Sequence, residues 1–249
     1  MDALRLVHYW WPVVMAWSIV VVVHRTTGRA VSSAGLCILL LGALAAYSLD
    51  RLRDSGSSRQ PKWLRAALLA ALLGAGFGGV LLLPQLSTQK LIFLGVLSAI
   101  TLLYPTAKRI PLVKAVLVPA VWTAAGIVLP SVGGGWPSLL TPIAPLLFLL
   151  LAAGCLLCDV KDFAADREAG VRSLPVQLGI VNTVSIAAAL AGLSAVLAWH
   201  EHWPGLLAGG LCMVAIAPWR QLLATESVGP LAVDFILTLP GFLIAWRLV

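Results

Sequence analysis

Acidic residues are the side chains in this sequence whose type and spacing most clearly predict chemistry. The chain has only ten Asp and Glu residues, and six of them form two clusters. Asp50 and Asp54 are spaced i, i+4, whereas Asp159, Asp162 and Asp166 are spaced i, i+3, i+7, and both spacings put carboxylates on one helical face. Such faces from two helices offer the oxygen ligands that Mg²⁺ prefers, and Mg²⁺ recruits substrate phosphates as further ligands.

The alternative is that these acids, together with Glu168, are solvated loop residues beside basic neighbours such as Arg51 and Lys161. Only 11% of the residues are charged, whereas soluble domains carry roughly 25%. In a chain with so few charges, a grouping of six acids favours a functional site over an ordinary solvated surface.

Basic residues that could take the charge of a diphosphate follow Tyr104 in the sequence. Lys108 and Arg109 come directly after the predicted fourth helix, and Lys114 follows shortly afterwards. Arg binds phosphate oxygens as a planar fork, and Lys binds them as a point charge. The competing interpretation is that these residues reflect only the usual enrichment of bases in cytoplasmic loops.

The apolar composition predicts that membrane-spanning helices position these groups. Hydrophobic residues make up 60% of the chain, and the mean hydropathy is +0.98. A water-soluble enzyme is excluded, and continuous apolar runs without alternation exclude a membrane barrel. The prediction is an all-α polytopic membrane helix bundle, one domain over residues 1–249, with two four-helix pseudo-repeats and a final helix. The nine predicted transmembrane helices cover residues 8–23, 30–50, 63–83, 90–104, 112–130, 138–160, 181–199, 203–219 and 228–247.

The distribution of Lys and Arg predicts the orientation of the bundle. Thirteen of the seventeen basic residues fall on one side of the predicted membrane, and the positive-inside rule makes that side cytoplasmic. The N-terminus and both acidic clusters are therefore expected in the cytoplasm and the C-terminus outside, in a bacterial or archaeal cytoplasmic membrane. This loop bias accounts for most of the net charge of +7, so no nucleic-acid partner is expected.

The second acidic cluster and the residues after it closely resemble a motif of the UbiA-type membrane prenyltransferases. Residues 159–179 read DVKDFAADREAGVRSLPVQLG, which is similar to the family's DxxDxxxD motif followed by GxR[TS]LPxxLG. Tyr104 and Lys108 resemble its YxxxK element, and residues 46–54 resemble its first motif, NDxxDxxxD. The first motif departs from the pattern, because Ala46 and Tyr47 stand where the family has Asn and Asp.

The resemblance implies Mg²⁺-dependent transfer of a prenyl group from a polyprenyl diphosphate to an aromatic or lipophilic acceptor within the membrane. It assigns the Mg²⁺ ligands and catalytic acids to Asp50, Asp54, Asp159, Asp162 and Asp166, with Lys108 as a further catalytic residue. Implied substrate-binding residues are Tyr47, Arg51, Tyr104, Arg109, Lys114, Lys161, Arg167 and Arg172. A membrane terpene cyclase and a catalytically degenerate prenyl-diphosphate-binding or transport protein remain as alternatives.

Asp234 is an acid inside the last predicted helix. Ionisable residues at such positions are rare and are functional candidates by default. A role in helix packing is an equally good interpretation, and the sequence leaves both open.

Overall fold

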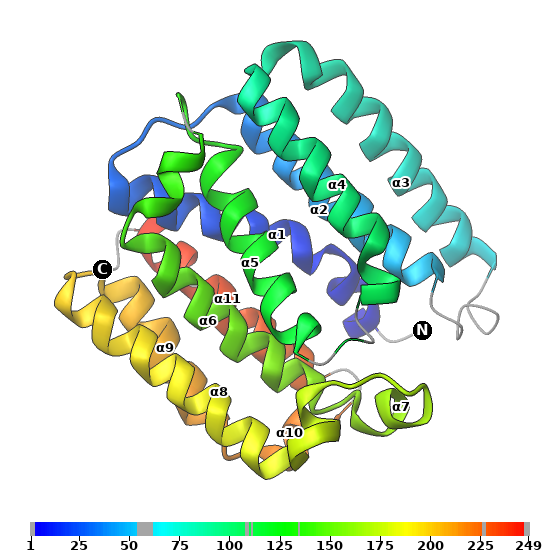
Figure 1. Ribbon diagram of the computed structural model, residues 1–249, viewed down its shortest axis with the longest axis vertical. Coiled ribbons are helices and arrows are strands. Elements are labelled where there is room, and N and C mark those ends of the chain that lie inside the picture. The colour runs from blue at the N-terminus through cyan, green and yellow to red at the C-terminus, as the bar shows by residue number, and fades with distance from the viewer. Residues whose placement is uncertain are drawn as a thin grey trace.

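The protein is a bundle of helices (Figure 1). The computed structural model describes residues 3–53, 62–107, 110, 112–133, 135–225 and 228–246. Within these ranges the only sheet-type pairing is an isolated β-bridge between Val31 and Ser131. The α-helices are α1 (Ala3–Thr27), α2 (Ser33–Arg53), α3 (Lys62–Leu82), α4 (Thr88–Ala107), α5 (Val113–Val128), α6 (Ile143–Asp159), α7 (Phe163–Glu168), α8 (Leu174–His200), α9 (Pro204–Ile216), α10 (Arg220–Leu223) and α11 (Val228–Ala245); the 3₁₀ helices are η2 (Leu83–Gln85) and η3 (Trp136–Leu140).

Each of the nine predicted segments overlaps one of the long helices, so the prediction of an all-helical bundle is confirmed for the described residues. The short helices α7 and α10 are additional to the prediction. Helix α8 begins at Leu174, earlier than expected, but its backbone breaks at Gly179, where φ is 80° and ψ is 160°. The long regular part of α8 therefore starts close to the predicted boundary at residue 181.

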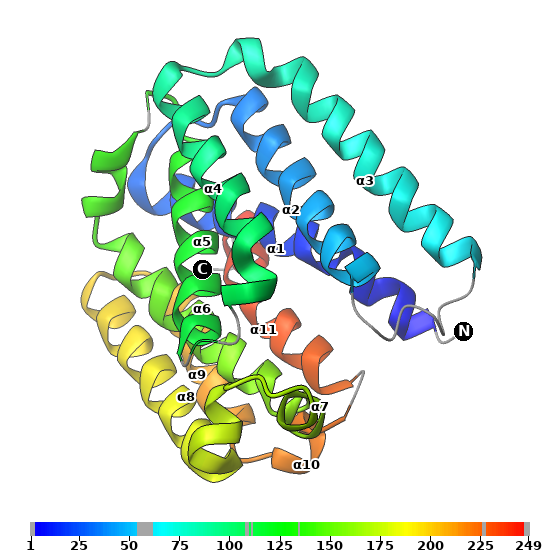
Figure 2. The ribbon, with the colours of Figure 1, turned by 45° about the vertical axis from the view of Figure 1, so that its right-hand side comes forward.

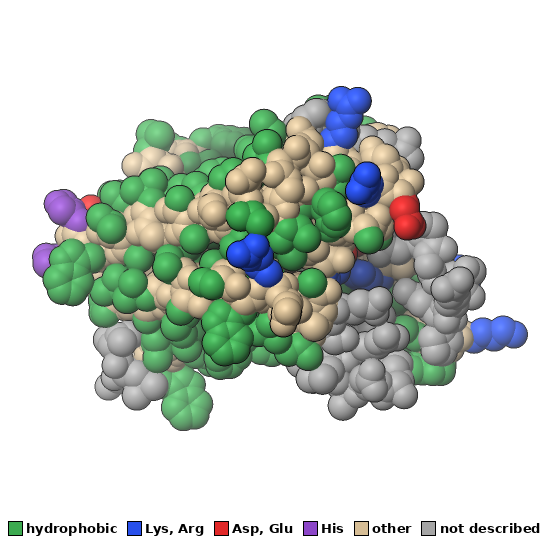
Figure 3. Space-filling model, turned by 90° about the horizontal axis from the view of Figure 1, so that it is seen from below, with side chains coloured by type: hydrophobic (Ala, Val, Ile, Leu, Met, Phe, Trp, Pro, Cys, Tyr) green, Lys and Arg blue, Asp and Glu red, His purple; other side chains and the backbone are tan. Residues whose placement is uncertain are grey.

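Five helical segments among the described residues are long and apolar enough to cross a membrane by length and composition: α2, α3 with η2, α4, α8 and α11. Helices α5, α6 and α9 are apolar but shorter. Hydrophobic side chains cover much of the face in Figure 3, where charged side chains are few. A lipid-facing surface has this composition, because lipid solvates apolar side chains and penalises charged ones.

The first three helices of each predicted four-helix unit pack on one another in chain order, whereas the third and fourth helices pack extensively only in the second unit, where α8 contacts α9. In the first unit α1 packs on α2 and α2 on α3, and in the second unit α5 packs on α6 and α6 on α8. Helix α11 closes the bundle by packing against α1, α6 and α9, as Figures 1 and 2 show. Asp50 lies near the end of α2 and Asp159 at the end of α6, the second helix of each unit.

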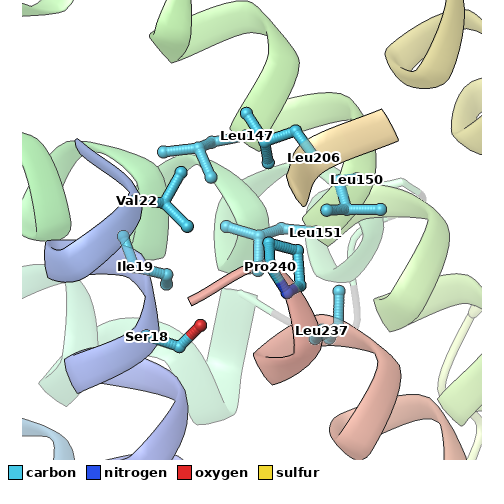
Figure 4. Close-up of a pocket in the computed structure, with 9 residues that line it drawn as sticks. All are labelled: Ser18, Ile19, Val22, Leu147, Leu150, Leu151, Leu206, Leu237 and Pro240. Carbon is cyan, nitrogen blue, oxygen red and sulfur yellow. The ribbon is translucent and has the colours of Figure 1, made fainter. Parts of the chain in front are cut away.

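The centre of the bundle is closely packed where α1 crosses α11. A Cβ atom added to Gly241 would lie 2.3 Å from the hydroxyl oxygen of Ser18, so only glycine permits this approach. The Ser18 hydroxyl donates a hydrogen bond of 2.9 Å to the carbonyl oxygen of Thr238. Figure 4 shows the small pocket beside this crossing, which apolar side chains such as Leu150 and Leu237 line.

Lys90 holds the opposite end of the bundle together. Its side chain is buried, and its Nζ donates hydrogen bonds of 2.7 Å to the carbonyl oxygens of Leu129 and Ser131. These bonds join the start of α4 to the end of α5, where the helix leaves carbonyl groups without intrahelical partners. Lys90 therefore has a structural role at the end away from the acidic clusters.

Candidate functional site

Three carboxylates of the second acidic cluster meet the ammonium group of Lys114. The Nζ atom of Lys114 lies 2.9 Å from Oδ1 of Asp159, 3.4 Å from Oδ2 of Asp166 and 3.7 Å from Oδ2 of Asp162. Lys114 is the second residue of α5; Asp159 ends α6, Asp162 directly precedes α7 and Asp166 lies within α7. We call Lys114 and these three aspartates the Lys114 cluster.

The backbone between α6 and α7 brings the three aspartates to one side. We expected one continuous helical face, and the structure corrects this, because α6 ends at Asp159 and α7 starts after Asp162. The amide of Asp162 still donates to the carbonyl of Asp159 at 3.1 Å, and the amide of Asp166 donates to the carbonyl of Asp162 at 2.7 Å. These bonds keep the backbone helix-like through the break, so the three aspartates still lie on one side of the chain.

Gly170 ends α7 in a Schellman motif. Its φ of 69° lies in the left-handed region. The amide of Val171 donates to the carbonyl of Asp166 at 2.8 Å, and the amide of Gly170 donates to the carbonyl of Arg167 at 3.4 Å. Val171 is buried, and the chain then enters α8 with Ser173 as its N-cap and Pro175 in the first turn. The glycine therefore sets the turn that positions α7 against α8.

Asp159 is the most buried member of the Lys114 cluster, with 4% of its surface exposed. Its Oδ1 faces Lys114, while its Oδ2 is buried and has no hydrogen-bond partner among the described residues. A second base, Lys161, lies 2.8 Å from Oδ1 of Asp162. Two ammonium groups thus face three carboxylates, and the local charge is negative if all five groups are ionised.

Tyr104, at the end of α4, connects the two acidic regions. Its half-buried hydroxyl lies within the electrostatic range of Lys114 and Asp159, and also of Asp50 on α2. Charged groups of α2, α5 and α6 therefore act on the end of α4. The approach of the first acidic region to the second stays a prediction.

The first acidic region contains a cation–π pair at the position where the sequence departs from the family pattern. The guanidinium carbon of Arg51 lies 4.9 Å from the centre of the Tyr47 ring. The charges of Arg51 and Lys161 both act on the Asp234 carboxylate of α11. Asp234 therefore interacts with bases from both motif regions, an arrangement that its position in the sequence did not predict.

Several predicted site residues lie apart from the Lys114 cluster or outside the described residues. The side chains of Arg167 and Arg172 are exposed to solvent. Asp54, Lys108 and Arg109 lie outside the residues that the structure describes. Within the described ranges, no group of three His, Cys, Asp or Glu side chains has the convergence needed to enclose a metal ion.

Two buried hydroxyl groups near the motifs were not among the predicted site residues. Ser48 is 1% exposed and Ser173 is 2% exposed, and neither Oγ has a hydrogen-bond partner among the described residues. Both serines lie inside the two motifs, and this position was the feature of the sequence that could have marked them as site residues. Serine is common at helix ends for local reasons, so its type alone carried little information about a site.

Comparison with known families identifies the fold. The model of the UbiA prenyltransferase family matches residues 57–239, which is well over half of the chain. The chain belongs to the UbiA prenyltransferase family. It is thus an integral membrane protein of a family of prenyltransferases. The matched range of the UbiA family contains the Lys114 cluster and begins after Asp54, so it leaves out the divergent first motif.

A solved structure of a UbiA homolog from Aeropyrum pernix K1, in its apo state, has a similar fold. The TM-score is 0.70 at 16% sequence identity, and the likeness covers 99% of this chain and 100% of that one. No curated protein sequence matches the chain. The structural likeness agrees with the family assignment and extends over the first acidic region as well.

Proposed function

We propose that this UbiA-family protein transfers a prenyl group from a polyprenyl diphosphate to a lipophilic acceptor at the cytoplasmic face of the membrane, in a reaction that requires Mg²⁺. The observation that carries this proposal is the Lys114 cluster, in which three carboxylates and a cation meet at the ends of apolar helices. The carboxylates would bind a metal cation, the basic side chains would bind a diphosphate, and the apolar helices would contact an isoprenoid chain.

The donor set of this region fits Mg²⁺. Carboxylate oxygens are its preferred protein ligands, and the buried Oδ2 of Asp159 has no partner among the described residues. We assign the binding of Mg²⁺ to the second motif together with the first. The proposed ligands are Asp159, Asp162, Asp166, Asp50 and Asp54. When bound, Mg²⁺ supplies positive charge that neutralises the diphosphate.

The basic residues around this region would bind the diphosphate and stabilise it as it leaves. Lys114 and Lys161 are already in ionic contact with the carboxylates, and the charge of Lys114 acts on the Tyr104 hydroxyl. As the allylic C–O bond breaks, its electron pair leaves with the diphosphate, and nearby cations stabilise the growing negative charge. We also assign substrate binding to Tyr47, Arg51, Arg109, Arg167 and Arg172. Lys108, which follows Tyr104 by four residues, is proposed as a catalytic residue that binds the diphosphate.

The isoprenoid chain would lie along the apolar helices, where little water is present to react with the allylic cation. The acceptor then supplies an electron pair to the prenyl carbon and loses a proton. This step requires an electron-rich acceptor, which is the condition that an aromatic ring or a lipid alcohol meets.

A second candidate is a protein that binds prenyl diphosphates without catalysis. The first motif has Ala46 and Tyr47 in place of Asn and Asp, and Arg51 packs over the Tyr47 ring. These two replacements remove one amide and one carboxylate that could otherwise bind a metal ion. A terpene cyclase, which needs no acceptor, is separated from both candidates by the assay below.

The test is release of diphosphate from geranyl, farnesyl and geranylgeranyl diphosphates by the purified protein in lipid nanodiscs with Mg²⁺. We expect release that depends on added acceptor and that Asp159→Asn abolishes. The matched control is Glu168→Gln, because Glu168 is an exposed acid on α7 that lies outside the Lys114 cluster.

Each result of this assay decides between the candidates. Release without acceptor indicates a cyclase, and binding of all three diphosphates without release indicates a non-catalytic protein. Equal release by wild type and Asp159→Asn would refute the assignment of the site.

A further inference from the structure

Lys114 occupies the centre of the carboxylate cluster that the proposed function assigns to a divalent cation. Its ammonium group has three N–H donors, and three carboxylates lie within 2.9 to 3.7 Å of it. We propose that Lys114 is the resident counter-ion of this cluster and competes with the divalent cation for the carboxylates. The inference deepens the proposed function, because it rests on the cluster being the cation site.

The position of Lys114 on its helix is unfavourable without these carboxylates. Lys114 lies in the first turn of α5, where the helix dipole favours acidic side chains and disfavours cations. The residue before the helix, Leu112, has a left-handed φ of 65°, which is uncommon for a side chain of this size. Two local preferences are thus violated here, as is typical of functional positions.

Burial makes Lys114 and Asp159 dependent on one another. The side chain of Lys114 is 20% exposed and that of Asp159 is 5% exposed. Removing one member of such a pair leaves a charge that is poorly solvated. With its carboxylates ionised the cluster therefore needs a cation, and in the structure Lys114 provides it.

A divalent cation and the Lys114 ammonium would repel one another at the same carboxylates. Mg²⁺ binds oxygen at about 2.0–2.1 Å, so carboxylate oxygens that now face Nζ must turn toward the ion. The buried, unpartnered Oδ2 of Asp159 offers the cation a first contact before the oxygens that face Lys114 turn. Entry of the cation would weaken the remaining contacts and release the ammonium group toward Tyr104 and the bound diphosphate.

The experiment measures the affinity of the purified protein in nanodiscs for Mn²⁺ alone, by the loss of the free-ion signal in electron paramagnetic resonance. We expect Lys114→Met to bind Mn²⁺ roughly tenfold or more tightly than wild type, because the competing charge is gone. The matched control is Lys114→Arg, which keeps the charge and should bind Mn²⁺ much as wild type does. Equal or weaker binding by Lys114→Met would overturn the inference.

A second measurement uses the wild-type protein and needs no variant to fold. Acetylation of Lys114 by a water-soluble acylating reagent, followed by mass spectrometry, reports whether the ammonium group is held by carboxylates. We expect Mg²⁺ to increase the rate of acetylation at Lys114 several-fold and to leave exposed Lys62 unchanged. No change, or slower acetylation of Lys114 with Mg²⁺, would contradict the release of this side chain.

These readouts separate the inference from the proposed function. Tighter Mn²⁺ binding by Lys114→Met without diphosphate release from any substrate would support the competition and refute the enzyme. Diphosphate release with no effect of Lys114→Met on Mn²⁺ affinity would support the enzyme and refute the competition. Failure of wild type and all variants to bind Mn²⁺ would overturn both.

Discussion

The Nζ atom of Lys114 lies 2.9 Å from Oδ1 of Asp159, and this pair joins the start of α5 to the end of α6. Both helices are apolar, so the pair concentrates charge at the boundary of the bundle. Of the predicted site residues, Asp162 and Asp166 also contact Lys114, and Lys161 contacts Asp162. Through this contact, a base and an acid that are far apart in the sequence become members of the same cluster.

The divergent first motif leads to a prediction about Ala46→Asn, which restores the amide of the family pattern. We expect this change to leave diphosphate release unchanged or lower, because the Arg51 and Tyr47 pair already fills this part of α2. The measurement is the rate of release with saturating substrate and Mg²⁺, and Ala45→Asn is the control for adding an amide to α2. A several-fold rise for Ala46→Asn alone would show that the site is degraded rather than specialised.

Gly170 gives a test of the turn that follows α7. We expect Gly170→Val to lower the free energy of unfolding by about 1–2 kcal/mol, because a β-branched residue does not tolerate a left-handed backbone. No atom lies within 4 Å of a Cβ added there, so the cost comes from the backbone and not from a clash.

Gly170→Asn is the matched variant, because Asn adopts left-handed φ more readily. Thermal unfolding in detergent should rank wild type first, Asn second and Val last. Equal stability of the Val and Asn variants would mean that the turn does not require φ of 69°.

Lys90→Met tests the structural role of the buried cation at the opposite end. The change leaves the carbonyl oxygens of Leu129 and Ser131 without the donor they share, and we expect a loss of about 1–3 kcal/mol. Diphosphate release per folded molecule should stay at the wild-type level. Lys62→Met, at the exposed start of α3, is the control, and equal thermal stability of the two variants would argue against this role.

The orientation predicted from the basic residues can be tested by cysteine labelling in intact cells. In a variant lacking the four native cysteines, a cysteine at exposed Glu168 should react only after the membrane is permeabilised. A cysteine at His200, whose side chain is 84% exposed at the far end of α8, should react with an impermeant maleimide from outside. The reverse pattern would place the Lys114 cluster outside the cell.

The sequence by itself determined the helices and the family. Each apolar run is local information, because lipid requires every spanning segment to satisfy its own backbone hydrogen bonds, and so all nine predicted segments appear as helices. The start of α8 was missed because Leu174 to Leu178 form a short turn of helix before the break at Gly179. The spacing of Asp159, Asp162 and Asp166 also predicted correctly that they lie on one side, because backbone hydrogen bonds continue through the break between α6 and α7.

Only the tertiary structure decided which groups meet. Lys114 and Asp166 are 52 residues apart in the sequence, and their contact depends on how α5 packs against α6, which no local pattern encodes. The same is true of Asp234, on which the charges of Arg51 and Lys161 act from two other parts of the bundle. Charge scarcity could indicate that the acids form a site, but helix packing alone placed a lysine among them.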